Sequence, residues 1–131
     1  MVNIATDSEN KKDNVVPLLG KDNFLFLTGD SNRVIDQLEG KYEINDTELS
    51  NILEKNTIRY EFLKRRKMAY YHIVVPNKET IFNKFLPDQI TPYKYGKSPI
   101  QKYIDKSSNS PCKIFYKPDT FKDIDNNAYY Y

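Results

Sequence analysis

The sequence predicts a single α/β domain, and three observations support that prediction. The chain has 131 residues, which suits one domain with one hydrophobic core. A helical pattern that begins near Asn45 leads into a β-prone segment over residues 70–75, which ends at Pro76. A helix followed by such a strand is typical of an α/β crossover unit. We therefore expect residues 70–75 to form a central strand that is buried on both faces.

Composition and charge exclude several classes of protein. Twenty Lys and Arg residues against eighteen Asp and Glu residues leave a net charge of +2, so the charge does not predict nucleic-acid binding. The single Cys, Cys112, excludes an internal disulfide, and the single His, His72, argues against a His-rich metal site. We expect no metal and no cofactor. The chain lacks an apolar segment as long as a signal peptide or a membrane span, which predicts a cytoplasmic protein.

The N-terminal elements follow from the order of polar and apolar segments. Residues 1–14 are too polar to offset their ordering entropy, so we expect a disordered leader before a domain over residues 15–131. Residues 24–27 are bulky and apolar and predict a short buried strand. After Ser31, apolar residues at helical spacing predict a short helix that stops at Gly40.

The clearest helix begins near Asn45, which lies three residues before Glu48 and so predicts a capping box. Residues 64–67 are all basic and lie where the helix dipole favours positive charge. We interpret them as a charged helix end instead of a phosphate site. The apolar positions that follow the helical period are Leu49, Ile52, Leu53, Tyr60 and Leu63.

The rest of the chain alternates between short segments of different kinds. Patterning predicts helical turns over residues 81–85 and 100–104, a linker over 106–111, strands over 112–116 and 128–131, and a turn over 119–121. Residues 77–80, Asn-Lys-Glu-Thr, follow the strand over 70–75 at its carboxyl end, where open α/β sheets bind ligands. The alternative for this polar cluster is a turn that caps the next helical stretch.

A few side chains offer nucleophiles or acids, and each has a structural alternative. Gly29, Asp30 and Ser31 follow a predicted strand, as the nucleophile block of SGNH hydrolases does. We favour Ser31 as a helix N-cap and His72 as a core or half-buried ring. A small Ser esterase that uses Ser31 and His72 is an alternative, and it requires the two side chains within about 2.6 to 3.2 Å.

The remaining candidates favour structural roles as well. Cys112 lacks a neighbouring base or a second Cys, so we expect a buried, small apolar side chain. Asp119 with Asp123, and Asp88 with Asp105, are candidate carboxylate pairs, although their spacing does not demand pairing. We therefore predict no catalytic, cofactor-binding or metal-binding residue.

Several segments together resemble alginate O-acetyltransferase-like proteins of the SGNH hydrolase-like superfamily. Residues 74–81, Val-Val-Pro-Asn-Lys-Glu-Thr-Ile, are the most specific part of the resemblance, which covers residues 17–131. The other matching segments, in the same order as in the family, are residues 20–27, 30–32, 40–42, 65–66, 86–87, 99–100 and 114–121. The resemblance implies a three-layer α/β/α sandwich and transfer of acetyl groups onto the hydroxyls of a polysaccharide.

In that family a Ser nucleophile, a His base and an orienting Asp perform the reaction, and this chain departs from the pattern. In one alignment residues 116–121 match the family's Tyr-Lys-Thr-Asp-Thr-His run, and Phe121 replaces the His that ends it. In the other, which we favour because it keeps the strand order without gaps, residues 128–131 are the strand that leads into the missing Asp-Thr-His-Trp motif. Both alignments lack the His and the downstream Ser, and in the favoured one Ser31 is not the family nucleophile.

The sequence thus predicts an N-terminal fragment or degenerate paralogue of a polysaccharide O-acetyltransferase-like protein, incomplete at its C-terminus and inactive alone. A polysaccharide or a glycan-synthesis enzyme is the expected partner. The alternative is a non-catalytic carbohydrate- or protein-binding module whose Tyr rings stack on sugars, although Tyr60, Tyr70 and Tyr71 lie where core packing would use them. An incomplete sheet leaves apolar strands uncovered, which predicts marginal stability or self-association.

Overall fold

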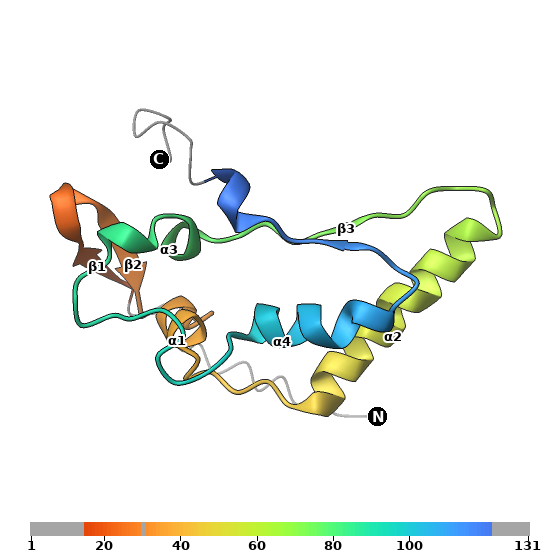
Figure 1. Ribbon diagram of the computed structural model, residues 1–131, viewed down its shortest axis with the longest axis horizontal. Coiled ribbons are helices and arrows are strands. Elements are labelled where there is room, and N and C mark those ends of the chain that lie inside the picture. Colours follow the sequence, from red (N-terminus) through yellow and green to blue (C-terminus); the bar gives the residue numbers. More distant parts are fainter. Residues whose placement is uncertain (1–14, 30, 122–131) are drawn as a thin grey trace, which may run out of the picture.

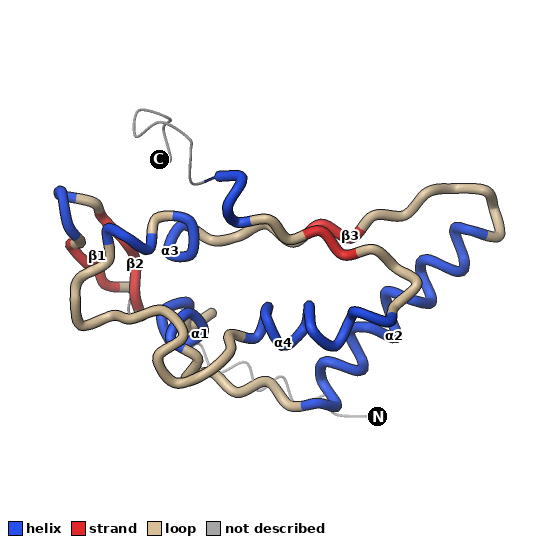
Figure 2. Tube along the Cα trace, viewed as in Figure 1, coloured by secondary structure: helices blue, strands red, loops and turns tan. Residues whose placement is uncertain are grey.

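A computed structural model of the chain describes residues 15–29 and 31–121. The expected leader over residues 1–14 and the expected strand over 128–131 lie outside these ranges. Within them the fold mixes helices and strands, as predicted for the α/β class, and holds two small sheets where one was expected (Figures 1 and 2). The described helices include none that is long and apolar enough to cross a membrane.

The first sheet is an antiparallel hairpin of β1 (Val16–Leu19) and β2 (Leu25–Thr28). The sequence did not predict β1, because Pro17 weakens its strand pattern, and β2 is the one strand that pairs with it among the described residues. The expected burial of the strand over 24–27 is wrong. Only Phe26 of β2 is buried, while Leu25 and Leu27 on the other face are 51% and 53% exposed. The hairpin therefore covers the core with one face, as the alternation of strand side chains requires.

Two helices follow the hairpin, α1 (Val34–Glu39) and α2 (Asp46–Lys64). Both were predicted, and the capping box between Asn45 and Glu48 is confirmed. The N-cap position of α1 belongs to Arg33, so the prediction of Ser31 as the N-cap is wrong.

A glycine contact fixes the end of α1. Gly40 takes a φ of +80°, which favours glycine, and a Cβ at this position would collide with the backbone of Gly96. The close approach of the two glycines holds the segment before α4 against the end of α1. Two backbone hydrogen bonds strengthen this contact, from the Tyr93 amide to Leu38 (2.9 Å) and from the Tyr95 amide to Glu39 (2.9 Å).

The second sheet is a parallel pair of β3 (His72–Ile73) and β4 (Ile114–Phe115). Between them in sequence lie α3 (Lys78–Ile81) and α4 (Pro99–Lys106), so the chain makes a helical crossover between parallel strands. This agrees with the predicted α/β crossover, except that the crossover follows β3 instead of preceding it. Residues 83–85, 107–109 and 118–121 form short 3-10 turns, the last of them at the expected turn.

The prediction that residues 70–75 form a strand buried on both faces is wrong. The strand is only two residues long, and Tyr71, Ile73 and Val75 are 63%, 67% and 75% exposed. The alternate residues, His72 and Val74, are half-buried. Helices α2 and α4 contact the sheet on the side of His72 (Figure 1). Within the described residues the other side has no α-helix, and the 3-10 turn over residues 118–121 borders it through Thr120.

The main hydrophobic core joins the hairpin, α1 and the α3 region. Its buried members are Phe26, Leu38, Ile81, Phe82, Phe85 and Leu86. Phe24 packs at its border, with its ring stacked 4.5 Å from the ring of Phe85. Lys78 of α3 ties the same parts together, because its Nζ donates a hydrogen bond to the Leu25 carbonyl (2.7 Å) and lies 5.0 Å from the Phe24 ring centroid.

Candidate functional site

The polar cluster at the carboxyl end of β3 caps a helix. Asn77 is the N-cap of α3, and its Oδ1 accepts hydrogen bonds from the backbone N–H (2.9 Å) and the Oγ1 hydroxyl (2.6 Å) of Thr80. An Asn at this position satisfies a free N–H of the first helical turn. The capping role that the sequence offered as an alternative is therefore confirmed.

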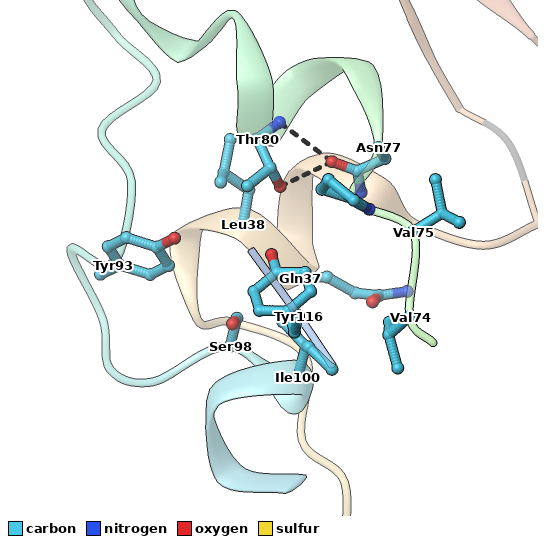
Figure 3. Close-up of a pocket in the computed structure, with 11 residues that line it drawn as sticks. Gln37, Leu38, Val74, Val75, Asn77, Thr80, Tyr93, Ser98, Ile100 and Tyr116 are labelled. Carbon is cyan, nitrogen blue, oxygen red and sulfur yellow. Dashed lines mark hydrogen bonds between the residues drawn. The ribbon is translucent and has the colours of Figure 1, made fainter. Parts of the chain in front are cut away.

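The same cluster also borders a cavity of about 150 Å³ (Figure 3). Its lining residues come from α1 and α3, from the segments after β3 and β4, and from the segment before α4 and its first turn. The polar ones are Gln37, Asn77, Thr80, Tyr93, Ser98 and Tyr116. A cavity of about this volume in another protein accommodates benzene, so the space here suits a group about the size of one unsubstituted six-membered ring. The cavity lies at the carboxyl end of β3, the position at which open α/β sheets bind ligands.

The lining is uncharged within the described part of the chain. Asn77 uses its Oδ1 for the cap, and no hydrogen bond within the described residues occupies its amide Nδ2. Gln37 donates its Nε2 to the Asn32 carbonyl (2.5 Å), which leaves the Oε1 as an acceptor. Burial raises the pKa of the Tyr116 hydroxyl, although its hydrogen bond with Thr80 opposes that effect. Tyr116 is therefore a neutral phenol at physiological pH.

Tyr93 reaches the cavity through an unusual backbone conformation. Its φ of +61° lies in the left-handed region, which is unfavourable for a residue with a side chain as large as tyrosine. The contact between Gly40 and Gly96 and the hydrogen bond to Leu38 hold it there. Strain of this kind persists where surrounding structure enforces it, and it often marks a binding site. Tyr93 remains 41% exposed and lines the cavity.

His72 belongs to a separate, structural network. Its Nδ1 lies 2.8 Å from the Asn56 amide Nδ2 and 3.2 Å from the Tyr103 hydroxyl. Tyr70 donates a hydrogen bond to the Asn56 Oδ1 (3.0 Å). Burial, together with the positive charge of Arg59, lowers the pKa of His72. The ring is thus neutral and half-buried, in agreement with the structural role predicted for it.

The structure does not bring Ser31 and His72 together. Ser31 is exposed in the turn before α1, and the hydrogen bonds of the described residues include none between these two side chains. The esterase alternative therefore lacks a base for its nucleophile. The other candidates agree with structural roles, since Cys112 is buried and its burial raises the pKa of the thiol.

The candidate carboxylates bind lysines instead of each other. Asp88 pairs with Lys21 (2.5 Å), and Asp105 pairs with Lys97 (2.6 Å). Asp123, the expected partner of Asp119, lies outside the described residues. The three tyrosines expected in the core differ in burial, because Tyr60 and Tyr70 are half-buried whereas Tyr71 is exposed.

Sequence reasoning missed three important residues. Tyr93 and Tyr116 lie in segments without periodic pattern, and only tertiary packing brings them to the same cavity. Asn56 could have been found from the sequence, because it is a polar residue at an apolar position of α2, seven residues after the buried Leu49.

Comparisons of the chain with models of protein families, with curated proteins and with solved structures find no match. The cavity is therefore the feature of the molecule that bears on its function.

Proposed function

We propose that this chain is a non-catalytic carbohydrate-binding module and that the cavity beside Asn77 holds one sugar ring. The observation that supports this proposal is the neutral lining, which combines amides, hydroxyls and two tyrosine rings with apolar walls. Ligand sites of this kind pair apolar surface with a few placed polar groups. A sugar ring matches both features, because it offers hydroxyls at its edge and C–H groups on its faces.

Each polar group has a role in this proposal. The free Nδ2 of Asn77 donates to a sugar hydroxyl, and the Oε1 of Gln37 accepts from one. The aromatic ring of Tyr93 stacks on the apolar side of the sugar ring, at a small cost in side-chain entropy. Phosphate and carboxylate ligands fit poorly, since the described lining contains no cation to neutralise them.

We also propose that the chain is related to polysaccharide O-acetyltransferase-like proteins. In this proposal it forms part of their three-layer SGNH hydrolase-like sandwich and does not catalyse acyl transfer by itself. Two features support it. Within residues 15–29 and 31–121, the parallel pair of β3 and β4 has α-helices on one face, as one half of such a sandwich would. The polar segment of the resemblance, residues 77–80, borders the cavity at the carboxyl end of β3.

Titration calorimetry with neutral hexoses and the matching uronic acids tests the sugar site. We expect a neutral hexose to bind with a dissociation constant of about 1 mM or lower. Tyr93→Asn should abolish binding, because Asn tolerates the left-handed conformation but removes the ring. Tyr95→Asn is the matched control, since Tyr95 lies two residues away and outside the cavity lining.

A second variant separates binding from folding. Asn77→Asp keeps an N-cap acceptor for Thr80 but removes the amide donor, so it should weaken sugar binding while preserving the melting temperature. The absence of binding by every hexose up to high millimolar concentration would contradict the proposal. Equal binding by wild type and Tyr93→Asn would also contradict it.

A further inference from the structure

The β3 and β4 pair presents an apolar surface on the side away from the helices. We call this surface the open face, and it consists of Tyr71, Ile73, Val75 and Phe115. These side chains are 63%, 67%, 75% and 38% exposed. Parallel strands in α/β proteins normally have helices over both faces, whereas within the described residues only the turn over residues 118–121 borders the open face, at one edge. A contiguous exposed apolar patch of this kind marks an interaction site.

Two lysines flank the open face. Lys113 and Lys117 are exposed and alternate with half-buried residues along β4, so they share its side with Phe115. Neither lysine forms an ion pair within the described part of the chain. They are four residues apart, which corresponds to about 13 Å along an extended strand. The partner of the open face should therefore carry two acidic groups at a similar separation.

Helix α2 of a second copy has these properties. Ile58 and Phe62, one turn apart, are 60% and 53% exposed on the side of α2 opposite the buried Leu49. Glu54 and Glu61 lie one turn before and one turn after Ile58, about 10 Å apart along the helix axis. Neither glutamate forms an ion pair within residues 15–29 and 31–121. The C-terminal half of α2 also projects away from the body of the protein (Figure 1).

We propose that the open face binds helix α2 of a second copy of this chain. Ile58 and Phe62 pack on the apolar centre, while Glu54 and Glu61 pair with the two lysines at its border. The incoming helix covers the second face of the parallel strands, as helices do in α/β proteins. The surface is small, so the association is weak, and it closes into a dimer if both copies exchange helices at once.

Reciprocal charge reversal tests the proposal directly. Sedimentation velocity over a concentration series up to about 1 mM should show self-association of the wild-type chain, weakened by salt. The variant K113E/K117E and the variant E54K/E61K should each associate at least tenfold more weakly. An equimolar mixture of the two variants should associate like wild type, because every contact between unlike variants again joins opposite charges.

The control is K84E/K94E, which changes net charge as K113E/K117E does, at exposed lysines outside both surfaces, and should associate like wild type. Circular dichroism of each variant is the check that it retains the helical content of the wild-type chain. A wild-type chain that stays monomeric across the series would overturn the proposal and assign the open face to a different protein. A mixture that fails to recover association would overturn it as well.

Discussion

The side-chain amide of Asn56 on α2 donates a hydrogen bond to Nδ1 of His72 on β3, with 2.8 Å between the two nitrogens. An amide nitrogen can only donate, so the bond requires His72 to be neutral with its proton on Nε2. Protonation would place two donors against each other. Burial and the charge of Arg59 lower the pKa of His72, so they also favour the neutral ring.

Stability should therefore decrease on the acidic side of the ordinary histidine pKa. A lowered pKa in the folded state means that the unfolded chain binds the proton first, at about pH 6.5. The stabilisation is complete above that pH and is lost progressively below it. Urea denaturation of wild type and His72→Gln between pH 8 and pH 5 measures the effect. The wild-type chain should lose more unfolding free energy than the variant over this range, and parallel losses would contradict the assignment.

Asn56→Ala should destabilise the fold by about 2 to 3 kcal/mol, because it leaves the buried hydroxyl of Tyr103 and the ring nitrogen of His72 without their amide donor. Asn51→Ala is the matched control, since Asn51 is exposed on the same helix and should change stability by less than about 0.5 kcal/mol. Chemical denaturation of both variants gives the comparison, and equal losses would show that the network contributes nothing.

Gly40→Ala should lower both stability and sugar binding. The new Cβ would collide with the backbone of Gly96 and would occupy a φ that disfavours alanine, so we expect a loss of at least about 1 kcal/mol in unfolding free energy. The displaced backbone would also move Tyr93 relative to the cavity. Thermal melting and hexose titration measure the two effects, and a variant that binds hexose like wild type would show that this contact does not position Tyr93.

Hydrolysis of an activated acetyl ester should not exceed the background rate. Ser31 lacks a histidine within hydrogen-bond reach, and a serine hydroxyl is a poor nucleophile without a base. Ser31→Ala should therefore give the same rate as wild type. Turnover above background that disappears in Ser31→Ala would restore the esterase interpretation.

Local signals in the sequence predicted α2, the end of α1 and the cap at Asn77, because capping boxes, helical periodicity and a C-terminal glycine act within a few residues. The error over residues 70–75 has a different origin. An apolar β-prone run indicates a strand, but its burial depends on which elements of the fold cover it.

The candidate site shows the same division between local and tertiary information. Residues 77–80 could be recognised in the sequence as a polar cluster at the carboxyl end of a strand, since they directly follow a predicted strand. Tyr93 was not, because its positive φ depends on the approach of Gly40 to Gly96, which are 56 positions apart in the chain, and no propensity predicts such a contact.

The position of Asn77 has a consequence for the motions of the protein. The residue that borders the cavity also begins α3, and the next residue, Lys78, holds the Leu25 carbonyl of the N-terminal hairpin. An occupant that binds the Asn77 amide would stabilise the first turn of α3 and, through Lys78, the strand it contacts. Amide protons of the hairpin should then exchange with solvent more slowly when the cavity is filled, although the hairpin does not line it.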